Sequence, residues 1–136
     1  MTFKNIAIAT AAALAALALS ADVARGETAI DDFTPPSYRY QQLAREQTPF
    51  DYWHQVAVNA AAIADYPNAL AAFDKAIDLA AVIKPRLLEE RGWIHYRLGN
   101  YDMARQDLNA AAELYRQERR YGAYANTRRM MLFLPS

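Results

Sequence analysis

Residues 91–104 read RGWIHYRLGNYDMA, and this stretch predicts two helices joined by a tight turn. Gly99 stands where the end of a helix favours a left-handed backbone conformation, which glycine adopts without strain. Asn100 follows, and its short polar side chain can accept the unpaired N–H groups at the start of a second helix. Gly92 and Ala104 are small, so the backbones of the two helices can approach closely. We therefore predict a helical hairpin here.

The same order of large, small and turn residues occurs 35 positions earlier in the chain. Residues 53–80 align with 88–115, and the aligned pairs include Trp53 with Leu88, Ala57 with Gly92, Asp65 with Asn100, Tyr66 with Tyr101, Ala69 with Ala104, Phe73 with Leu108, and Ala76 with Ala111. Thr48 and Pro49 mark the start of the first helix, and Pro85 marks the start of the third. A repeat of this length is typical of a solenoid built from helix pairs.

These residues resemble the tetratricopeptide repeat family. The family pattern has a bulky and then a small residue in its first helix, a Gly-Asp/Asn-Tyr turn, and Ala, an aromatic or leucine, and another Ala along its second helix. The resemblance covers 50–117, and it departs from the family in its period of 35 residues instead of about 34 and in Ala64, where glycine is usual. It implies an all-α fold with two tetratricopeptide-like helix pairs, an α-solenoid fragment, and flanking capping helices. The chain resembles a small exported bacterial member of the family.

The flanking segments are expected to complete the fold, because two helix pairs seldom bury enough surface alone. Tyr38, Tyr40 and Leu43 are apolar residues of a short predicted helix that would cover the open edge of the first pair. We predict six segments, which are a signal peptide (1–26), a linker (27–36), a capping helix (37–47), repeat 1 (48–84), repeat 2 (85–120) and a C-terminal capping helix (121–136).

The N-terminal segment has the features of a secretory signal. Lys4 precedes the uncharged run IAIATAAALAALAL at 6–19, whose 14 residues are too few to span a bilayer, which takes about 20. Small residues suited to a signal peptidase follow, and we expect cleavage between Ala18 and Gly26. The mature protein would then be periplasmic or secreted. An uncleaved membrane anchor and an ordinary buried helix are the alternatives.

Composition argues against several classes of function. The chain has 15 Lys and Arg against 15 Asp and Glu, so it lacks the surplus of positive charge that a nucleic-acid-binding protein needs. It has no cysteine, hence no disulfide and no thiolate nucleophile. The two histidines, His54 and His95, form no motif with the ligand spacing of a metal site, and we interpret His95 as a core histidine. We therefore predict no enzymatic activity, no metal and no cofactor.

The resemblance implies that the first helix of each pair lines a concave groove, which in the family commonly holds an extended peptide or a partner helix. By this resemblance, the groove-facing residues are Asp51, His54, Val58, Arg86, Glu89, Trp93, Tyr96 and Arg97. Trp93 and Tyr96 offer apolar area with polar tips, as binding hot spots do. An ordinary hydrated helix surface is the alternative. His54 and Val58 stand where the family's chaperone-tail binders have a lysine and asparagine clamp, so that specificity is not expected.

The C-terminal segment contains five consecutive apolar residues, which are Met130, Met131, Leu132, Phe133 and Leu134. Such a run is too long for one exposed helix face, so we predict a helix over 123–134 that packs on 101–115. The alternative is a surface that docks a partner or a second copy. The expected function is an exported interaction module that holds a peptide or partner protein in its groove. The alternative function is a self-associating scaffold, which an uncleaved N-terminal segment would anchor to a membrane.

Overall fold

The computed structural model describes residues 33–136. Within this range the chain forms five helices and no strand, and the helices are α2 (Pro49–Ala62), α3 (Tyr66–Leu79), α4 (Pro85–Arg97), α5 (Tyr101–Gln117) and α6 (Tyr121–Phe133). The predicted all-α fold is confirmed. The predicted signal peptide (1–26) and the first residues of the predicted linker lie outside the described part of the chain. None of the helices in that part combines the length and the apolar character that a bilayer span requires.

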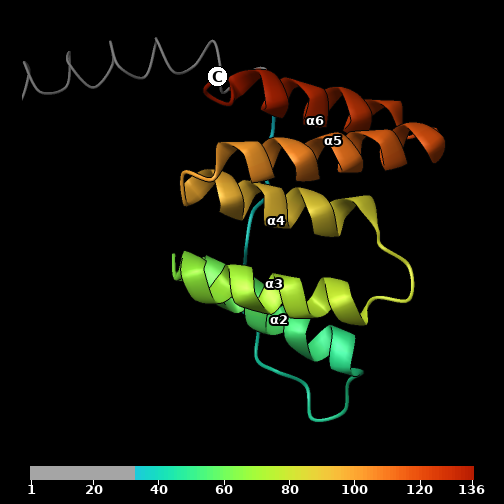
Figure 1. The fold of residues 1–136 in the computed structure, drawn as a ribbon. Helices are drawn as coiled ribbons and strands as arrows, with labels where there is room; N and C mark the ends of the chain where they lie inside the picture. Colours follow the sequence, from blue (N-terminus) through green and yellow to red (C-terminus); the bar gives the residue numbers. More distant parts are fainter. Residues whose placement is uncertain (1–32) are drawn as a thin grey trace, which may run out of the picture. The chain divides into compact units, whose positions relative to one another are not determined.

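The helices pack as two hairpins and a covering helix. α2 packs against α3, and α4 packs against α5, whereas α3 and α4 share a less extensive contact that joins the two pairs (Figure 1). α6 packs against α5, which is where the predicted capping helix was expected. The two pairs therefore correspond to the two sequence repeats.

The predicted cap at the start of α2 is confirmed, whereas Asn100 and its repeat partner Asp65 do not cap the helices that follow them. Thr48 does cap α2, because its Oγ1 accepts the N–H of Asp51 at 3.1 Å and donates to the Asp51 carboxylate at 2.7 Å. The side chains of Asp65 and Asn100, which precede α3 and α5, accept no backbone N–H of the helix that follows. The Asp65 carboxylate instead accepts from the side-chain amide of Asn68 at 2.7 Å.

The hairpin turns share one backbone geometry, which also recurs between α5 and α6. Each contains a residue in the left-handed region, namely Ala64 and Arg119 at φ 60° and Gly99 at φ 78°. The following N–H donates to the carbonyl five residues back, and these bonds are Asp65 N to Ala60 O at 2.9 Å, Asn100 N to His95 O at 2.8 Å and Arg120 N to Tyr115 O at 2.9 Å. This pattern closes the end of a helix by satisfying one of its last carbonyls.

Small buried residues set the spacing between helices, and their 35-residue period continues into α6. Ala57 and Thr127 are fully buried, and Gly92 lies midway between them in the sequence. A Cβ atom on Gly92 would lie 3.0 Å from Cβ of Asp107 and 3.3 Å from Cγ of Leu108, so α4 and α5 touch through this glycine. α6 therefore continues the pattern of first helices that α2 and α4 begin.

An ionic network links three helices inside this packing. Arg91 of α4 donates from Nε and Nη2 to the two carboxylate oxygens of Asp107 of α5, at 2.8 and 2.7 Å, and from Nη1 to Asp74 of α3 at 3.0 Å. His95 is buried beside Asp107, with its Nε2 at 3.9 Å from Oδ2. This placement agrees with the interpretation of His95 as a core histidine.

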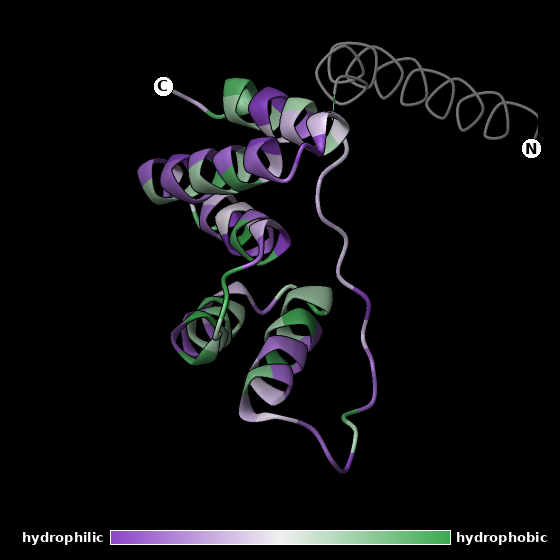
Figure 2. Ribbon diagram, turned by 90° about the vertical axis from the view of Figure 1, so that its right-hand side faces the viewer, coloured by the Kyte–Doolittle hydropathy of each residue, from purple (hydrophilic) through white to green (hydrophobic). Residues whose placement is uncertain are grey.

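The structure contradicts the predicted capping helix at 37–47, where it contains no helix. Residues 34–47, which we call the strap, run as an extended segment along one side of the helices (Figure 2). Pro35 and Pro36 favour this conformation because proline donates no N–H and restricts the residue before it to extended geometry. Tyr38 and Tyr40 lie two residues apart, and in the extended chain Tyr38 is half-buried while Tyr40 is exposed.

Candidate protein-interaction groove

Two asparagines hold the backbone of the strap against the helices. Asn126 of α6 accepts the N–H of Thr34 at 2.6 Å and donates to the Thr34 carbonyl at 2.9 Å. Asn59 of α2 accepts the N–H of Gln41 at 2.8 Å and donates to the Gln41 carbonyl at 2.7 Å. Each amide thus pairs with both backbone groups of one residue, as a neighbouring β-strand would. Such bonds recognise an extended backbone whatever side chains it carries.

One side chain of the strap is inserted between these two attachment points. The Tyr38 hydroxyl donates to the backbone carbonyl of Glu90 at 2.7 Å, and its ring lies edge-on to Phe73, with centroids 6.3 Å apart. Burial raises the pKa of Tyr38 above its usual range, so the hydroxyl remains protonated and available as a donor. Tyr38 is therefore the apolar anchor of the strap.

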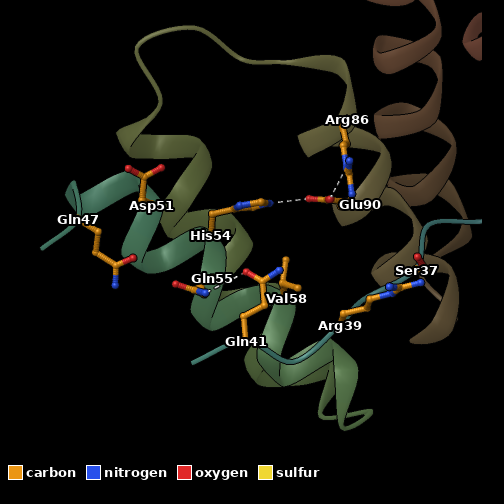
Figure 3. A pocket seen from close by; sticks show the side chains of 10 residues that line it. All are labelled: Ser37, Arg39, Gln41, Gln47, Asp51, His54, Gln55, Val58, Arg86 and Glu90. Atoms are coloured by element: carbon orange, nitrogen blue, oxygen red, sulfur yellow. Dashed lines mark hydrogen bonds and ion pairs between the residues drawn. The ribbon is translucent and has the colours of Figure 1, made fainter. Parts of the chain in front are cut away.

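A polar cavity of about 410 Å³ lies between the strap, α2 and α4. Its lining residues, shown in Figure 3, are Ser37, Arg39, Gln41, Gln47, Asp51, His54, Gln55, Val58, Arg86 and Glu90. Four of the eight predicted groove residues, Asp51, His54, Val58 and Arg86, therefore line one cavity. The other side of that cavity belongs to the strap.

The carboxylate of Glu90 organises the cavity, although the sequence analysis did not select it. Glu90 is only 3% exposed, and its Oε2 lies 2.7 Å from His54 Nε2 while its Oε1 accepts from Arg86 Nε at 2.9 Å (Figure 3). His54 also stacks on Phe50, with centroids 5.8 Å apart. These contacts orient the His54 ring and the Arg86 guanidinium toward the buried carboxylate and position them at the wall of the cavity.

Glu89 lies in a neighbouring cavity of about 280 Å³. Its carboxylate accepts a hydrogen bond from the Tyr115 hydroxyl at 2.7 Å. Burial raises the pKa of Glu89, and the bond from Tyr115 partly opposes that rise. The strap residues from Thr34 to Ser37 line this cavity as well. Glu89 therefore faces the same strap as the first four residues, one cavity further along.

The remaining three predicted groove residues contact other parts of the fold. The Trp93 and Tyr96 rings have centroids 4.6 Å apart, and both also pack on Phe133 of α6, at 6.4 and 5.7 Å. Arg97 lies over the ring of Tyr66, at 5.3 Å from its centroid. Trp93 and Tyr96 thus help to bind α4 to the covering helix, and a role for these three residues in partner binding stays a prediction.

The apolar C-terminal run divides between packing and exposure. Met130 and Leu134 are buried, and Phe133 packs on α4 as described above. Leu132 is 85% exposed. Most of the run therefore contributes to the core, and self-association through it stays a prediction that depends chiefly on Leu132.

Besides Glu90, sequence reasoning missed Asn59 and Asn126, the two groove residues that bind the backbone of the strap. A weak signal exists, because asparagine is an unfavourable residue inside a helix and both lie well within one. Within residues 33–136, no three His, Cys, Asp or Glu side chains come together in a group that could hold a metal ion.

Comparison with known families agrees with this architecture. The model of the tetratricopeptide repeat matches residues 85–118, which comprise α4, the Gly99 turn and α5. Residues 85–118 are therefore a tetratricopeptide repeat. No curated protein and no solved structure matches it. Tetratricopeptide repeats are generally non-catalytic and bind partner proteins, so this tetratricopeptide repeat protein is a protein–protein interaction module.

Proposed function

We propose that this tetratricopeptide repeat protein holds an extended segment of a partner protein in the groove along α2, α4 and α6. The observation that carries the proposal is the pair of backbone-directed amides, Asn59 and Asn126, which already hold an extended segment there. Main-chain bonds supply affinity for an extended peptide, and the adjacent side-chain pockets supply specificity. The polar cavity lined by Asp51, His54 and Arg86 is the specificity pocket of this arrangement.

The two histidines support a binding role over a catalytic one. His54 is engaged by the buried Glu90 carboxylate, and His95 lies in the interior beside Asp107, away from the cavity lining. A general base needs access to the proton that it removes. We assign His54, whose ring is held by the Glu90 carboxylate, to shaping the groove.

A photo-crosslinking experiment tests the groove. A photoreactive amino acid replaces Val58, which lines the cavity, or Ile63, which is exposed at the turn after α2 and does not line it. The Val58 variant should yield an adduct with a partner segment, and mass spectrometry should map that segment to an extended peptide. Adducts of equal yield at both positions would contradict the proposed groove.

We also propose that the protein is exported, on the basis of the uncharged run at 6–19 and the small residues that follow it. Cell fractionation and mass spectrometry of the protein from its native source test this proposal. A mature chain that begins between Ala18 and Gly26 and is found outside the cytoplasm is expected. An intact Met1 on membrane-bound protein would instead support the anchored alternative.

A further inference from the structure

We propose that residues 34–41 of the strap are a displaceable occupant of the groove, and that an extended partner segment with a tyrosine at the place of Tyr38 replaces them. The inference rests on the proposed function and deepens it, because the way in which the strap is bound defines what a competitor must offer. The juxtaposition of Asn126, the Tyr38 slot and Asn59 along one extended segment carries the inference.

The spacing of the three contacts defines the competing segment. Asn126 pairs with Thr34, the slot receives Tyr38, and Asn59 pairs with Gln41, so the contacts fall on the first, fifth and eighth residues of an eight-residue run. An extended run of this length spans roughly 25 Å. A partner segment must therefore be extended throughout and must place its anchor at the fifth residue.

The slot favours tyrosine over other anchors. It offers the Phe73 ring for a T-shaped contact with an aromatic ring, and the Glu90 carbonyl to a hydroxyl donor at 2.7 Å. Phenylalanine would fill the same volume without donating to that carbonyl. Aliphatic side chains would lack both the ring contact and the donor. The flanking positions tolerate variety, because the two asparagines bind backbone groups only.

Few contacts hold the strap in the groove, so it can dissociate from the groove. Between Thr34 and Tyr38, two prolines donate no N–H, so this part of the strap forgoes backbone pairing. Tyr40 and Leu43 are exposed, which leaves Tyr38 as the principal buried side chain of residues 34–43. The strap nevertheless competes strongly, since a short tether gives it an effective concentration on the order of millimolar.

A competition experiment on the full chain tests the inference. The probe is a synthetic peptide of residues 34–43, fluorescently labelled and titrated against the wild-type chain and the Tyr38→Ala variant. A strap that is docked more than about nine-tenths of the time lowers the apparent affinity for a competitor by about tenfold or more. The peptide should therefore bind Tyr38→Ala at least about tenfold more tightly than it binds the wild type.

Matched controls separate the slot from a general effect on the strap. Tyr40→Ala, which removes an exposed tyrosine two residues away, should leave the affinity for the peptide at the wild-type value. A peptide with alanine in place of Tyr38 should not bind, and one with phenylalanine there should bind more weakly. Gln41→Pro is a second variant for the case in which Tyr38→Ala does not fold. It removes the N–H that Asn59 accepts and leaves the core side chains unchanged, so it should weaken docking of the strap and raise the affinity for the peptide.

Hydrogen exchange at the Gln41 amide reports displacement directly. In the free wild-type chain this amide should be protected, and a saturating peptide should make it exchange rapidly. Equal affinity of the peptide for the wild type, Tyr38→Ala and Gln41→Pro would overturn the inference. Dimers of the wild-type chain that Tyr38→Ala abolishes would also overturn it, in favour of strap exchange between copies. A partner adduct at Val58 with the Gln41 amide still protected would overturn the inference but leave the proposed function intact.

Discussion

At two of the hairpin turns, a residue with a side chain adopts the left-handed conformation that glycine adopts at the third. Ala64 and Arg119 both have φ 60°, whereas Gly99 has φ 78°. The resemblance to the family pattern had already singled out Ala64 as a departure. The structure shows that the turn geometry is kept and that the alanine bears the backbone strain.

Replacing Ala64 with glycine should therefore stabilise the protein by about 1 kcal/mol, because a side chain in this conformation costs roughly that amount. Urea unfolding followed by circular dichroism measures the change in the free energy of unfolding. Gly99→Ala is the matched reverse experiment, since no atom lies within 4 Å of its added Cβ and the change tests the backbone alone. A Gly99→Ala variant as stable as the wild type would show that the turn is not the source of strain.

His95 should make stability depend on pH near neutrality. Burial lowers the pKa of His95 below its ordinary 6.5, and the nearby Arg91 reinforces this, while Asp107 and Asp74 oppose it. The unfolded chain thus binds a proton at a higher pH than the folded chain does. Stability from the neutral ring is full above about pH 6.5 and falls as the pH drops toward the folded pKa. Glu89 acts in the opposite direction, since burial raises its pKa.

The pH effect of His95 is isolated by comparing the wild type with His95→Gln, in which Glu89 is unchanged. Urea unfolding at pH 7.5 and pH 5.5 should show a smaller loss of stability in the variant than in the wild type. The same pH dependence in both proteins would mean that His95 titrates equally in the folded and unfolded chains.

Among the elements, the helix pairs could be predicted from sequence and the strap could not. Each pair depends on local chemistry, such as Thr48 and Pro49 at a helix start or Gly99 at a turn, and these signals lie within a few residues of the structure that they produce. The strap depends on Asn59 and Asn126, and the latter is 92 residues away from its partner Thr34. A pattern of apolar residues alone does not reveal such a bond, so the tyrosines of the strap were assigned to a helix.

The covering helix α6 should contribute stability through its buried face. Met130→Ala should destabilise the protein by about 2–5 kcal/mol, because Met130 is fully buried and its removal leaves a cavity. Leu132→Ala on the same helix should change stability by less than about 0.5 kcal/mol, since Leu132 is 85% exposed. Thermal unfolding measures both variants. Equal effects of the two would contradict the packing of α6 on α5.

Within the whole molecule, only part of the candidate site could be predicted, because the sequence pattern does not reveal contacts between distant elements. The family resemblance placed Asp51, His54, Val58 and Arg86 on one surface, and the structure brings them to one cavity. The family resemblance could not show that Glu90 would be buried at the centre of that surface. Nor could it show that Trp93 and Tyr96 would be covered by Phe133, because that contact depends on how α6 lies against α4.

The packing of α4 on α5 within the second helix pair should depend on Arg91 and Asp107. Replacing Asp107 with alanine leaves the guanidinium of Arg91 partly buried without its bidentate partner, and losing one member of a buried ion pair costs about 3–5 kcal/mol. Asp74→Ala removes the other carboxylate, whose side chain is 54% exposed, and should cost less than about 1 kcal/mol. Urea unfolding of both variants measures the difference. A larger loss for Asp74→Ala would reverse the assigned roles of the two carboxylates.

The strap also bears on how the protein unfolds. In a stack where each helix packs only on its sequence neighbours, unfolding can begin at either end without involving the other end. Residues 34–41 hydrogen-bond to both α2 and α6. Because unfolding at one end of the stack disturbs this shared segment, it also weakens the contacts at the other end. Displacing the strap would therefore destabilise α2 and α6 together, and a bound partner segment in its place would restore the coupling between them.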